Sequence, residues 1–266
     1  MRILAWTIFL LQLLLSPASA GQECIVGMPE LKGPQEPLPE CEALIEEAYR
    51  RAGMAVRFIY IPMLRDFAET SAQVLDASAG RTDVAAQGND NIVLSATPLL
   101  KTSLVAYTVR SRPGIKTWRD LRQGKVGYLR GDMTTRNLAR ENKLRTTAFA
   151  SLEQGFGALR AGHLAAFVTH TTFLELAESP HLTREFNASP PLYTGYFYHA
   201  LNKENGGMAV RLSRIFDEML KDGTSEKLLG RYAFLLPESE WGAEKAQDAT
   251  PGDTAHKDLA PMASHR

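Results

Sequence analysis

Cysteine is scarce in this chain, and so is any excess of charge. Only two cysteines occur among 266 residues, Cys24 and Cys41. Lysine and arginine together number 30, as do aspartate and glutamate, so the formal net charge is zero. A neutral chain has no long-range attraction to nucleic acid or to an anionic lipid surface. Partners must therefore be inferred from particular sites, and nucleic acid is not expected among them.

Motifs of the common enzyme classes are also missing. The sequence has no Gly-x-Ser-x-Gly turn, no His-Glu-x-x-His pair and no glycine-rich phosphate loop. The glycines of "GFGALRAG", residues 155–162, fall within a helical pattern and not at a strand-to-helix turn. We therefore expect no catalytic residues and no cofactor.

Candidate metal ligands are few. His163 and His170 are seven residues apart, which places them on opposite faces of a strand. His256 and His265 fall in a polar C-terminal segment and are expected to be solvated. No metal site is predicted.

The first twenty residues have the pattern of a secretory signal. A basic Arg2 precedes an apolar run from Ile3 to Leu15, and small residues stand at Ala18 and Ala20. The run is shorter than the roughly 20 residues that span a bilayer. We expect cleavage after Ala20 and a periplasmic mature protein. We expect no membrane anchor, because Cys24 is not preceded by the small residues that a lipoprotein signal has before its cysteine.

An exported chain with an even number of cysteines favours a disulfide. We expect Cys24 and Cys41 to be bridged, which would stabilise the fold by roughly 3 kcal/mol in the chain-entropy model. The alternative, a redox or metal-binding pair, lacks both a Cys-x-x-Cys spacing and a neighbouring histidine.

Strand and helix patterns alternate along the chain. Alternating or apolar runs predict strands at 24–29, 55–62, 83–87, 103–109, 125–129 and 164–170, and an extended segment at 193–202. Helical patterns occur at 39–53, 63–80, 131–142, 151–162, 171–179, 207–223 and 225–233. This order predicts an α/β fold with a mostly parallel sheet covered by helices.

The alternation falls into two units. We predict a signal peptide at 1–20, a first lobe at 21–109, a second lobe at 110–192, a return to the first lobe at 193–236 and a disordered tail at 237–266, where charge and small residues replace apolar ones. Two extended crossings, near residues 105–108 and 196–200, would act as hinges, and a cleft would lie between the lobes.

Several short stretches, in order, resemble the family 3 periplasmic solute-binding proteins that serve polar amino acid importers. They are "AGRTDV" at 79–84, "SATPLLKTSLVAYTV" at 95–109, "WRDLRQGKVGYLRGDMTT" at 118–135, "LRAGHLAAFVTH" at 159–170 and "LKDGTSEKLLGRY" at 220–232. The resemblance covers roughly residues 24–232. It implies a two-lobed (type II) periplasmic binding protein fold with two crossing hinge strands.

Within that family the chain is similar to the branch associated with quinoprotein dehydrogenases, the MxaJ and XoxJ type. The similarity lies in Gly88, Asp90, Val93, Leu94, Ser95, Ala96, Pro98 and Lys101, and in "IPMLRDF" at 61–67. The chain lacks the tryptophan-rich segment that precedes this arginine in that branch, and its first strand lacks the branch's usual sequence. This resemblance implies a partner, a PQQ-dependent methanol dehydrogenase.

The expected cleft differs from that of the amino acid binders. Those proteins hold the ligand's carboxylate with an arginine after the third strand, where this chain offers Asn89, Asp90 and Asn91. They hold the ammonium with a carboxylate from the second lobe, where this chain has Thr169. The three residues 89–91 could instead form a simple turn.

A second group of candidates surrounds a helix start at "RGDMTT". Thr134 and Thr135 stand where the family binds anions at a helix N-terminus, but Asp132 is placed to cap that helix itself. Arg130 could offset its charge. Arg65 follows a strand end and could face the cleft, or it could be a solvated helix residue.

Two functions follow. The branch resemblance and the missing charged pair favour a non-catalytic accessory protein that docks on a methanol dehydrogenase or assists its assembly or activity. The alternative is the receptor of an ABC importer for a small polar ligand other than an amino acid.

Overall fold

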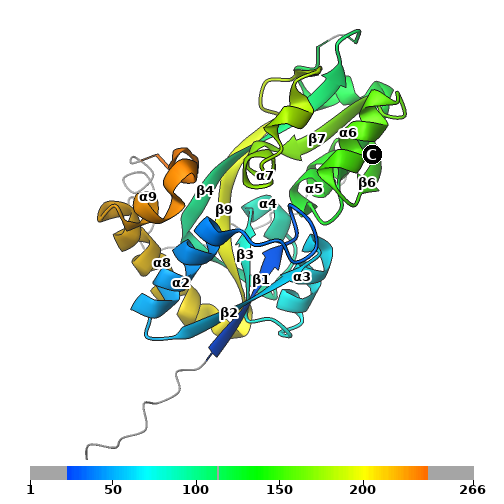
Figure 1. Ribbon diagram of the computed structural model, residues 1–266. Helices are drawn as coiled ribbons and strands as arrows, with labels where there is room; N and C mark the ends of the chain where they lie inside the picture. Colours follow the sequence, from blue (N-terminus) through cyan, green and yellow to red (C-terminus); the bar gives the residue numbers. More distant parts are fainter. Residues whose placement is uncertain (1–22, 113, 239–266) are drawn as a thin grey trace, which may run out of the picture.

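The computed structural model describes residues 23–112 and 114–238, which form two α/β lobes joined by two long strands (Figure 1). The mixed α/β, two-lobed architecture predicted from the sequence is confirmed. No helix in the described part of the chain is long and apolar enough to cross a membrane. The predicted signal peptide, almost all of the predicted tail, and both C-terminal histidines lie outside the described residues.

Lobe 1 is built on three parallel strands. These are β1 (Glu23–Pro29), β2 (Ala55–Ile61) and β3 (Ala77–Arg81), with β1 in the middle. Its helices are α2 (Pro39–Arg51), α3 (Met63–Ser71), α4 (Asp83–Ala86), α8 (Gly206–Lys221) and α9 (Thr224–Leu229), followed by the 3-10 helix η4 (Gly230–Leu235). The C-terminal helices thus return to the lobe in which the described chain begins (Figure 1).

Lobe 2 repeats this plan around another parallel set. Its strands are β5 (Lys125–Leu129), β6 (Arg145–Phe149) and β7 (Ala166–His170), with β5 in the middle. Its helices are η1 (Trp118–Gln123), α5 (Met133–Glu141), α6 (Leu152–Arg160), α7 (Thr171–Leu176) and η2 (Pro180–Thr183). The sequence did not predict β6, because "RTTAF" shows no run of apolar residues and the strand lies at the edge of the sheet.

Two antiparallel strands connect the lobes. β4 (Ile92–Val109) and β9 (Tyr193–Asn202) pair from Ile92 with Asn202 to Leu104 with Tyr193. β4 then continues along β7 and the short β8 (Phe186–Ala188), while β9 also pairs with β3. One sheet, ordered β2-β1-β3-β9-β4-β7-β5-β6, therefore runs through both lobes.

The third strand lies elsewhere than the sequence suggested. The predicted helix over 63–80 ends at Ser71, the strand is Ala77–Arg81, and the predicted strand at 83–87 is the short helix α4. The small residues of "ASAG" resemble a helix by propensity, but they fit a strand packed between β1 and β9. Thr82 Oγ1 accepts a hydrogen bond from Ala85 N and so starts α4.

The predicted disulfide is not formed, and both cysteines are free. Cys24 stands at the start of β1, whereas Cys41 lines a cavity beside Met28 and Pro29 at the other end of that strand. The strand from Cys24 to Pro29 spans roughly 16 Å, and a disulfide requires Cα atoms within about 7 Å. Burial raises the pKa of the Cys24 thiol to about 11 and that of the Cys41 thiol to about 12, so neither is a reactive thiolate.

Candidate functional site

The candidate site is the cleft in which the two lobes face one another. Residues at or just after the carboxyl ends of β1 and β3 in lobe 1 and of β5 in lobe 2 line this cleft, and ligands of α/β sheets bind at the carboxyl ends of strands. The cleft has two parts. The inner compartment, of about 30 Å³, is lined among others by Asp66, Arg81, Thr82, Asp132, Thr134 and Phe197. The outer compartment, of about 420 Å³, lies between residues 30–34 and 62–64 of lobe 1 and residues 129–130 and 150–154 of lobe 2.

Direct hydrogen bonds join the lobes across the inner compartment. The hydroxyl oxygens of Thr82 in lobe 1 and Thr134 in lobe 2 lie 2.8 Å apart, and both side chains are buried. Beside them, Asn137 Nδ2 of lobe 2 donates to the Val84 carbonyl of lobe 1 at 2.9 Å. The structure therefore holds the cleft closed through the protein's own polar groups.

Close backbone packing accompanies these bonds. Gly131, just before α5, has a φ of +91°, and a Cβ atom there would lie 2.5 Å from the backbone nitrogen of Leu64 in lobe 1. A side chain at this position would collide with the first turn of α3. Glycine at 131 is thus required both by its backbone conformation and by the contact between lobes.

A buried ion pair forms the lobe 1 wall of the inner compartment. Arg81 Nη2 donates to Asp66 Oδ2 and, at 2.8 Å, to the carbonyl of Met63, while Arg81 Nε donates to Ser78 Oγ at 3.1 Å. The Arg81 and Asp66 side chains are 7% and 1% exposed, so each charge depends on the other. Arg81 Nη1 has no hydrogen-bond partner among the described residues, which leaves a donor available beside the compartment.

Asp132 supplies the lobe 2 wall and caps α5, as the sequence predicts. Asp132 Oδ1 accepts from the backbone nitrogen of Thr135 at 3.0 Å, and Asp132 Oδ2 accepts from the Thr135 hydroxyl. Burial favours the neutral acid, but His170 and the two Thr135 donors hold the pKa of Asp132 below its usual value. An anionic ligand at this helix start would meet a carboxylate already in place.

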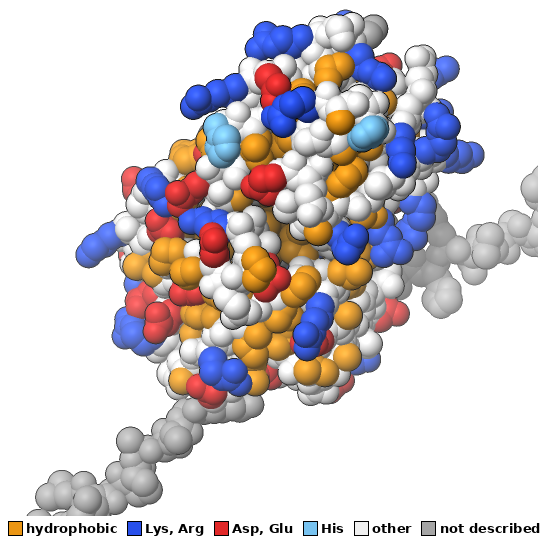
Figure 2. Space-filling model, turned by 45° about the vertical axis from the view of Figure 1, so that its right-hand side comes forward, with side chains coloured by type: hydrophobic (Ala, Val, Ile, Leu, Met, Phe, Trp, Pro, Cys, Tyr) orange, Lys and Arg blue, Asp and Glu red, His pale blue; other side chains and the backbone are white. Residues whose placement is uncertain are grey.

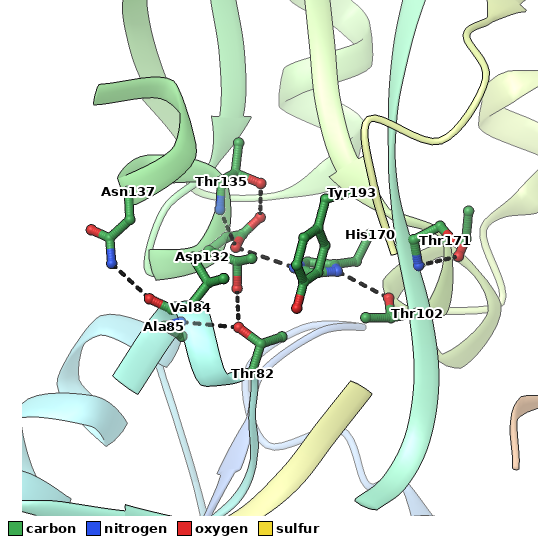
Figure 3. A network of polar contacts seen from close by, with 12 residues as sticks. Thr82, Val84, Ala85, Thr102, Asp132, Thr135, Asn137, His170, Thr171 and Tyr193 are labelled. Atoms are coloured by element: carbon green, nitrogen blue, oxygen red, sulfur yellow. Dashed lines mark hydrogen bonds and ion pairs between the residues drawn. The ribbon is translucent and has the colours of Figure 1, made fainter. Parts of the chain in front are cut away.

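His170 connects lobe 2 to the crossing strands. Its Nδ1 lies 2.9 Å from Thr102 Oγ1 of β4, and its Nε2 lies 3.4 Å from Asp132 Oδ1 (Figure 3). The ring packs against Phe173 of α7 and Phe197 of β9, with centroid distances of 4.8 and 5.0 Å. Its Nε2 has no hydrogen bond of normal geometry within the described residues. A fully buried histidine thus joins Asp132 at the inner compartment to both crossing strands, β4 through Thr102 and β9 through Phe197.

The residues 89–91 form a turn away from the inner compartment. Asn89 Oδ1 accepts from the Asn91 backbone nitrogen at 3.2 Å and from Ser71 Oγ at 3.1 Å. Asp90 and Asn91 are exposed. Arg65 is also exposed, and its Nε donates to Glu69 Oε1 at 2.5 Å.

The candidates from "RGDMTT" lie at the cleft or next to it. Arg130 lines the outer compartment, and Asp132 and Thr134 line the inner one. Thr135 is buried behind them and bonds to Asp132.

Thr169 is fully buried on β7, and its hydroxyl has no partner in the described part of the chain.

Two polar residues at the cleft, Arg81 and Asp66, were not among the residues predicted from the sequence, and His170 was considered there only as a metal ligand. Arg81 was missed because the third strand was predicted at 83–87, which placed Arg81 in a loop instead of at the end of a strand. A charged residue directly after four small ones, in "ASAGR", is the signal that could have found it. Among the described residues no group of three or more His, Cys, Asp or Glu could hold a metal ion.

No protein-family model and no curated protein sequence matches this chain. Many solved structures match by fold. A histidine kinase sensor domain with similarity to periplasmic binding proteins gives a TM-score of 0.69 at 16% identity, covering 82% of this chain and 99% of that chain. The P235GK mutant of ArgBP from T. maritima gives 0.64 at 16% identity, covering 79% and 94%.

A third match has a similar extent. An arginine third transport system periplasmic binding protein from Legionella pneumophila gives a TM-score of 0.61 at 17% identity, covering 79% of this chain and 99% of that chain. At such identities the likeness shows the fold alone. The chain has the two-lobed fold of the periplasmic solute-binding proteins. The methanol-dehydrogenase branch is not confirmed.

Proposed function

We propose that this chain is a non-catalytic, periplasmic solute-binding receptor whose cleft takes a small uncharged polar molecule. The observation that carries the proposal is that the charged groups of both walls already have partners in the protein: Arg81 is ion-paired with Asp66, and Asp132 accepts hydrogen bonds from Thr135 and lies 3.4 Å from His170 Nε2. A cleft whose charged groups already have partners, and which offers Arg81 Nη1 as a hydrogen-bond donor, suits a neutral ligand.

A free amino acid would be a poor ligand for this cleft. Its carboxylate needs an unpaired cation and its ammonium an unpaired anion, and removing a partner from a buried pair is costly. The inner compartment of about 30 Å³ also has room for only about two water-sized groups in the closed form. A ligand with a hydroxyl or carbonyl oxygen could instead accept from Arg81 Nη1 and exchange hydrogen bonds with Thr82 and Thr134.

The structural neighbours support a role in solute binding. They are described as arginine-binding proteins, a substrate binding protein of an amino acid ABC transporter, and a sensor domain. Together with the predicted signal peptide, this supports a periplasmic receptor that delivers its solute to an ABC importer.

A thermal-shift panel tests this function. Sugars, polyols, urea and small amides would be screened against the mature protein beside the twenty amino acids, with calorimetry on every solute that raises the melting temperature. We expect an uncharged solute to bind, Thr134→Val to weaken its binding, and Thr146→Val, at an exposed position of β6, to leave its binding unchanged. Micromolar binding of arginine or another amino acid would contradict the proposal.

A second candidate, the accessory protein, is favoured by the uneven distribution of charge. Residues 110–192 contain 13 Lys and Arg against 7 Asp and Glu, whereas residues 23–109 contain 7 against 12. Blue side chains accordingly predominate over the upper lobe in Figure 2. Such a basic lobe suits docking on an acidic protein surface.

The basic side chains gather where strands β5 and β6 begin, away from the cleft. Lys125 lies beside Arg145 in the sheet, and Arg122 donates to the Asn142 carbonyl at the end of α5, near Arg140 and Lys143. None of these five has an ion-pair partner among the described residues.

Co-purification tests the accessory function. A PQQ-dependent methanol dehydrogenase is the partner that the branch resemblance implies, and no comparison supports it. If the accessory role is correct, that enzyme co-elutes with the wild-type protein at low salt and is lost with Arg140→Glu and Arg145→Glu. The charge reversal Arg57→Glu, on lobe 1, serves as the control. Elution as a lone chain at low salt would reject the accessory role.

A further inference from the structure

An apolar cavity of about 60 Å³ adjoins the inner compartment and belongs to no part of the cleft described so far. Its wall takes Met28 and Leu44 from lobe 1, Leu100 from β4, and Phe173 and Leu176 from lobe 2. It therefore lies at the hinge, where both lobes and a crossing strand meet.

The cavity has no polar side chain in its wall. Cys41 is the least apolar group there, and its thiol is kept protonated by burial, which raises its pKa to about 12. A wholly apolar cavity tends to stay dry and to take up apolar groups, because water inside it would lack hydrogen-bond partners.

Only a thin wall separates this cavity from the polar inner compartment. Pro29, Gly80, Phe173 and Phe197 line both spaces. The two phenylalanine rings are stacked, with a centroid distance of 5.5 Å and an angle of 22° between their planes. Small rotations of these two side chains would join a polar compartment and an apolar one into a single site.

We propose that the two spaces together bind one small amphipathic molecule, with an uncharged polar head at Arg81, Thr82 and Thr134 and a short apolar tail in the hinge cavity. This inference rests on the proposed function and names its class of ligand. An alkyl amide has the required form: its carbonyl accepts from Arg81 Nη1, and its NH2 group donates to a threonine oxygen.

The two volumes limit the size of the ligand. An engineered apolar cavity of about 150 Å³ accommodates benzene, so a cavity of about 60 Å³ accommodates only a few carbon atoms. The inner compartment, of about 30 Å³, accommodates a head of two or three heavy atoms. The ligand class is therefore narrow, and it excludes long-chain lipids.

A homologous series of primary amides, from acetamide to hexanamide, tests the inference. Calorimetry or ligand-observed NMR on the mature protein would give the dissociation constant of each. Each added methylene group should tighten binding about fourfold while the tail still enters the cavity. The gain should stop after three or four carbons. Equal affinity across the series would overturn the inference.

Two variants alter the cavity in opposite directions. Cys41→Phe fills it from α2 and should remove the dependence on tail length, while Val74→Phe, at a position 62% exposed, should not. Leu176→Ala enlarges the cavity and should move the best tail to a longer amide. If neither variant changes the length dependence, the tail binds elsewhere and the inference fails.

The same series separates this inference from the proposed function. Binding of acetamide or urea with no gain for longer amides would retain the receptor and reject the apolar tail site. Failure of every amide, while another uncharged solute binds, would likewise reject only the tail site. If no uncharged solute binds at all, both proposals fail.

Discussion

Thr82 of lobe 1 and Thr134 of lobe 2 share a hydrogen bond across the closed cleft, with their Oγ1 atoms 2.8 Å apart. Each comes from a different lobe, so this bond exists only when the lobes are together. Thr82 Oγ1 also accepts from Ala85 N, so the same hydroxyl starts α4 and joins the lobes. Closure here is achieved by side chains of the protein and is open to competition from a ligand.

The threonine pair should show measurable coupling. A double-mutant cycle with Thr82→Val and Thr134→Val, followed by urea unfolding, is expected to give a coupling energy of about 1 kcal/mol, the usual net worth of a buried hydrogen bond. The exposed pair Ser103 and Thr194, whose hydroxyls lie 3.4 Å apart, is the control and should couple by much less. Zero coupling between Thr82 and Thr134 would show that the lobes do not meet there in solution.

Gly131→Ala should hold the cleft open. The added Cβ would lie 2.5 Å from Leu64 N, so closure to the observed distance becomes impossible. Small-angle X-ray scattering should show a larger radius of gyration than for the wild type. Gly162→Ala is a matched control, because Gly162 has a φ of +76° but has no atom within 4 Å of its Cβ position. Equal radii for all three proteins would contradict the prediction.

Asp66→Asn should destabilise the protein strongly. The substitution leaves the buried Arg81 guanidinium without its counter-charge, which typically costs about 3–5 kcal/mol. Glu69→Gln, which removes the partner of the exposed Arg65, should cost less than about 1 kcal/mol. Urea unfolding of the two variants measures both, and equal losses would mean that the Arg81–Asp66 pair is not buried in solution.

The cysteines should behave as free thiols. The intact mature protein should have the mass of the reduced chain, and dithiothreitol should leave its melting temperature unchanged. Ellman's reagent should react slowly at pH 8 with the native protein and with two thiols after unfolding, since burial raises both thiol pKa values. A mass lower by two hydrogens, together with a melting temperature that falls when reductant is added, would show that the disulfide forms.

His199 should make stability fall as the pH is lowered. It is fully buried between Tyr49 and the Ala79 carbonyl, and burial lowers its pKa from 6.5 to about 4. Between these two pH values the histidine is protonated in the unfolded chain but stays neutral in the folded protein. The contribution of His199 to the free energy of unfolding is therefore fully present above pH 6.5 and is lost toward pH 4, by about 3 kcal/mol. His199→Phe should flatten this part of the profile in urea titrations. The exposed His163→Gln should not, and an unchanged slope in His199→Phe would assign the loss to another group.

Sequence patterns were sufficient for the two-lobed plan and insufficient for the cleft. Long periodic segments such as 39–51 and 206–221 were located correctly, because their apolar faces are wide and regular. The strand "ASAGR" was not, because four small residues carry no periodic signal and its place is decided by the partners on either side.

The candidate site shows the same limit. The cap of α5 at Asp132 is a local feature and was predicted. The bond between Thr82 and Thr134 joins residues 52 positions apart, and the pair of Asp66 with Arg81 depends on how α3 packs on β3. The predicted disulfide was wrong because cellular compartment and cysteine count carry no information on the distance between Cys24 and Cys41, which lie at opposite ends of β1.

Native mass spectrometry of the mature protein, purified gently from the periplasm of cells that make it, shows directly whether the cleft carries a solute. We expect a single chain that carries one small uncharged molecule, which mild activation should release. A chain that carries an amino acid, or a complex with a large protein subunit and no small molecule, would contradict it.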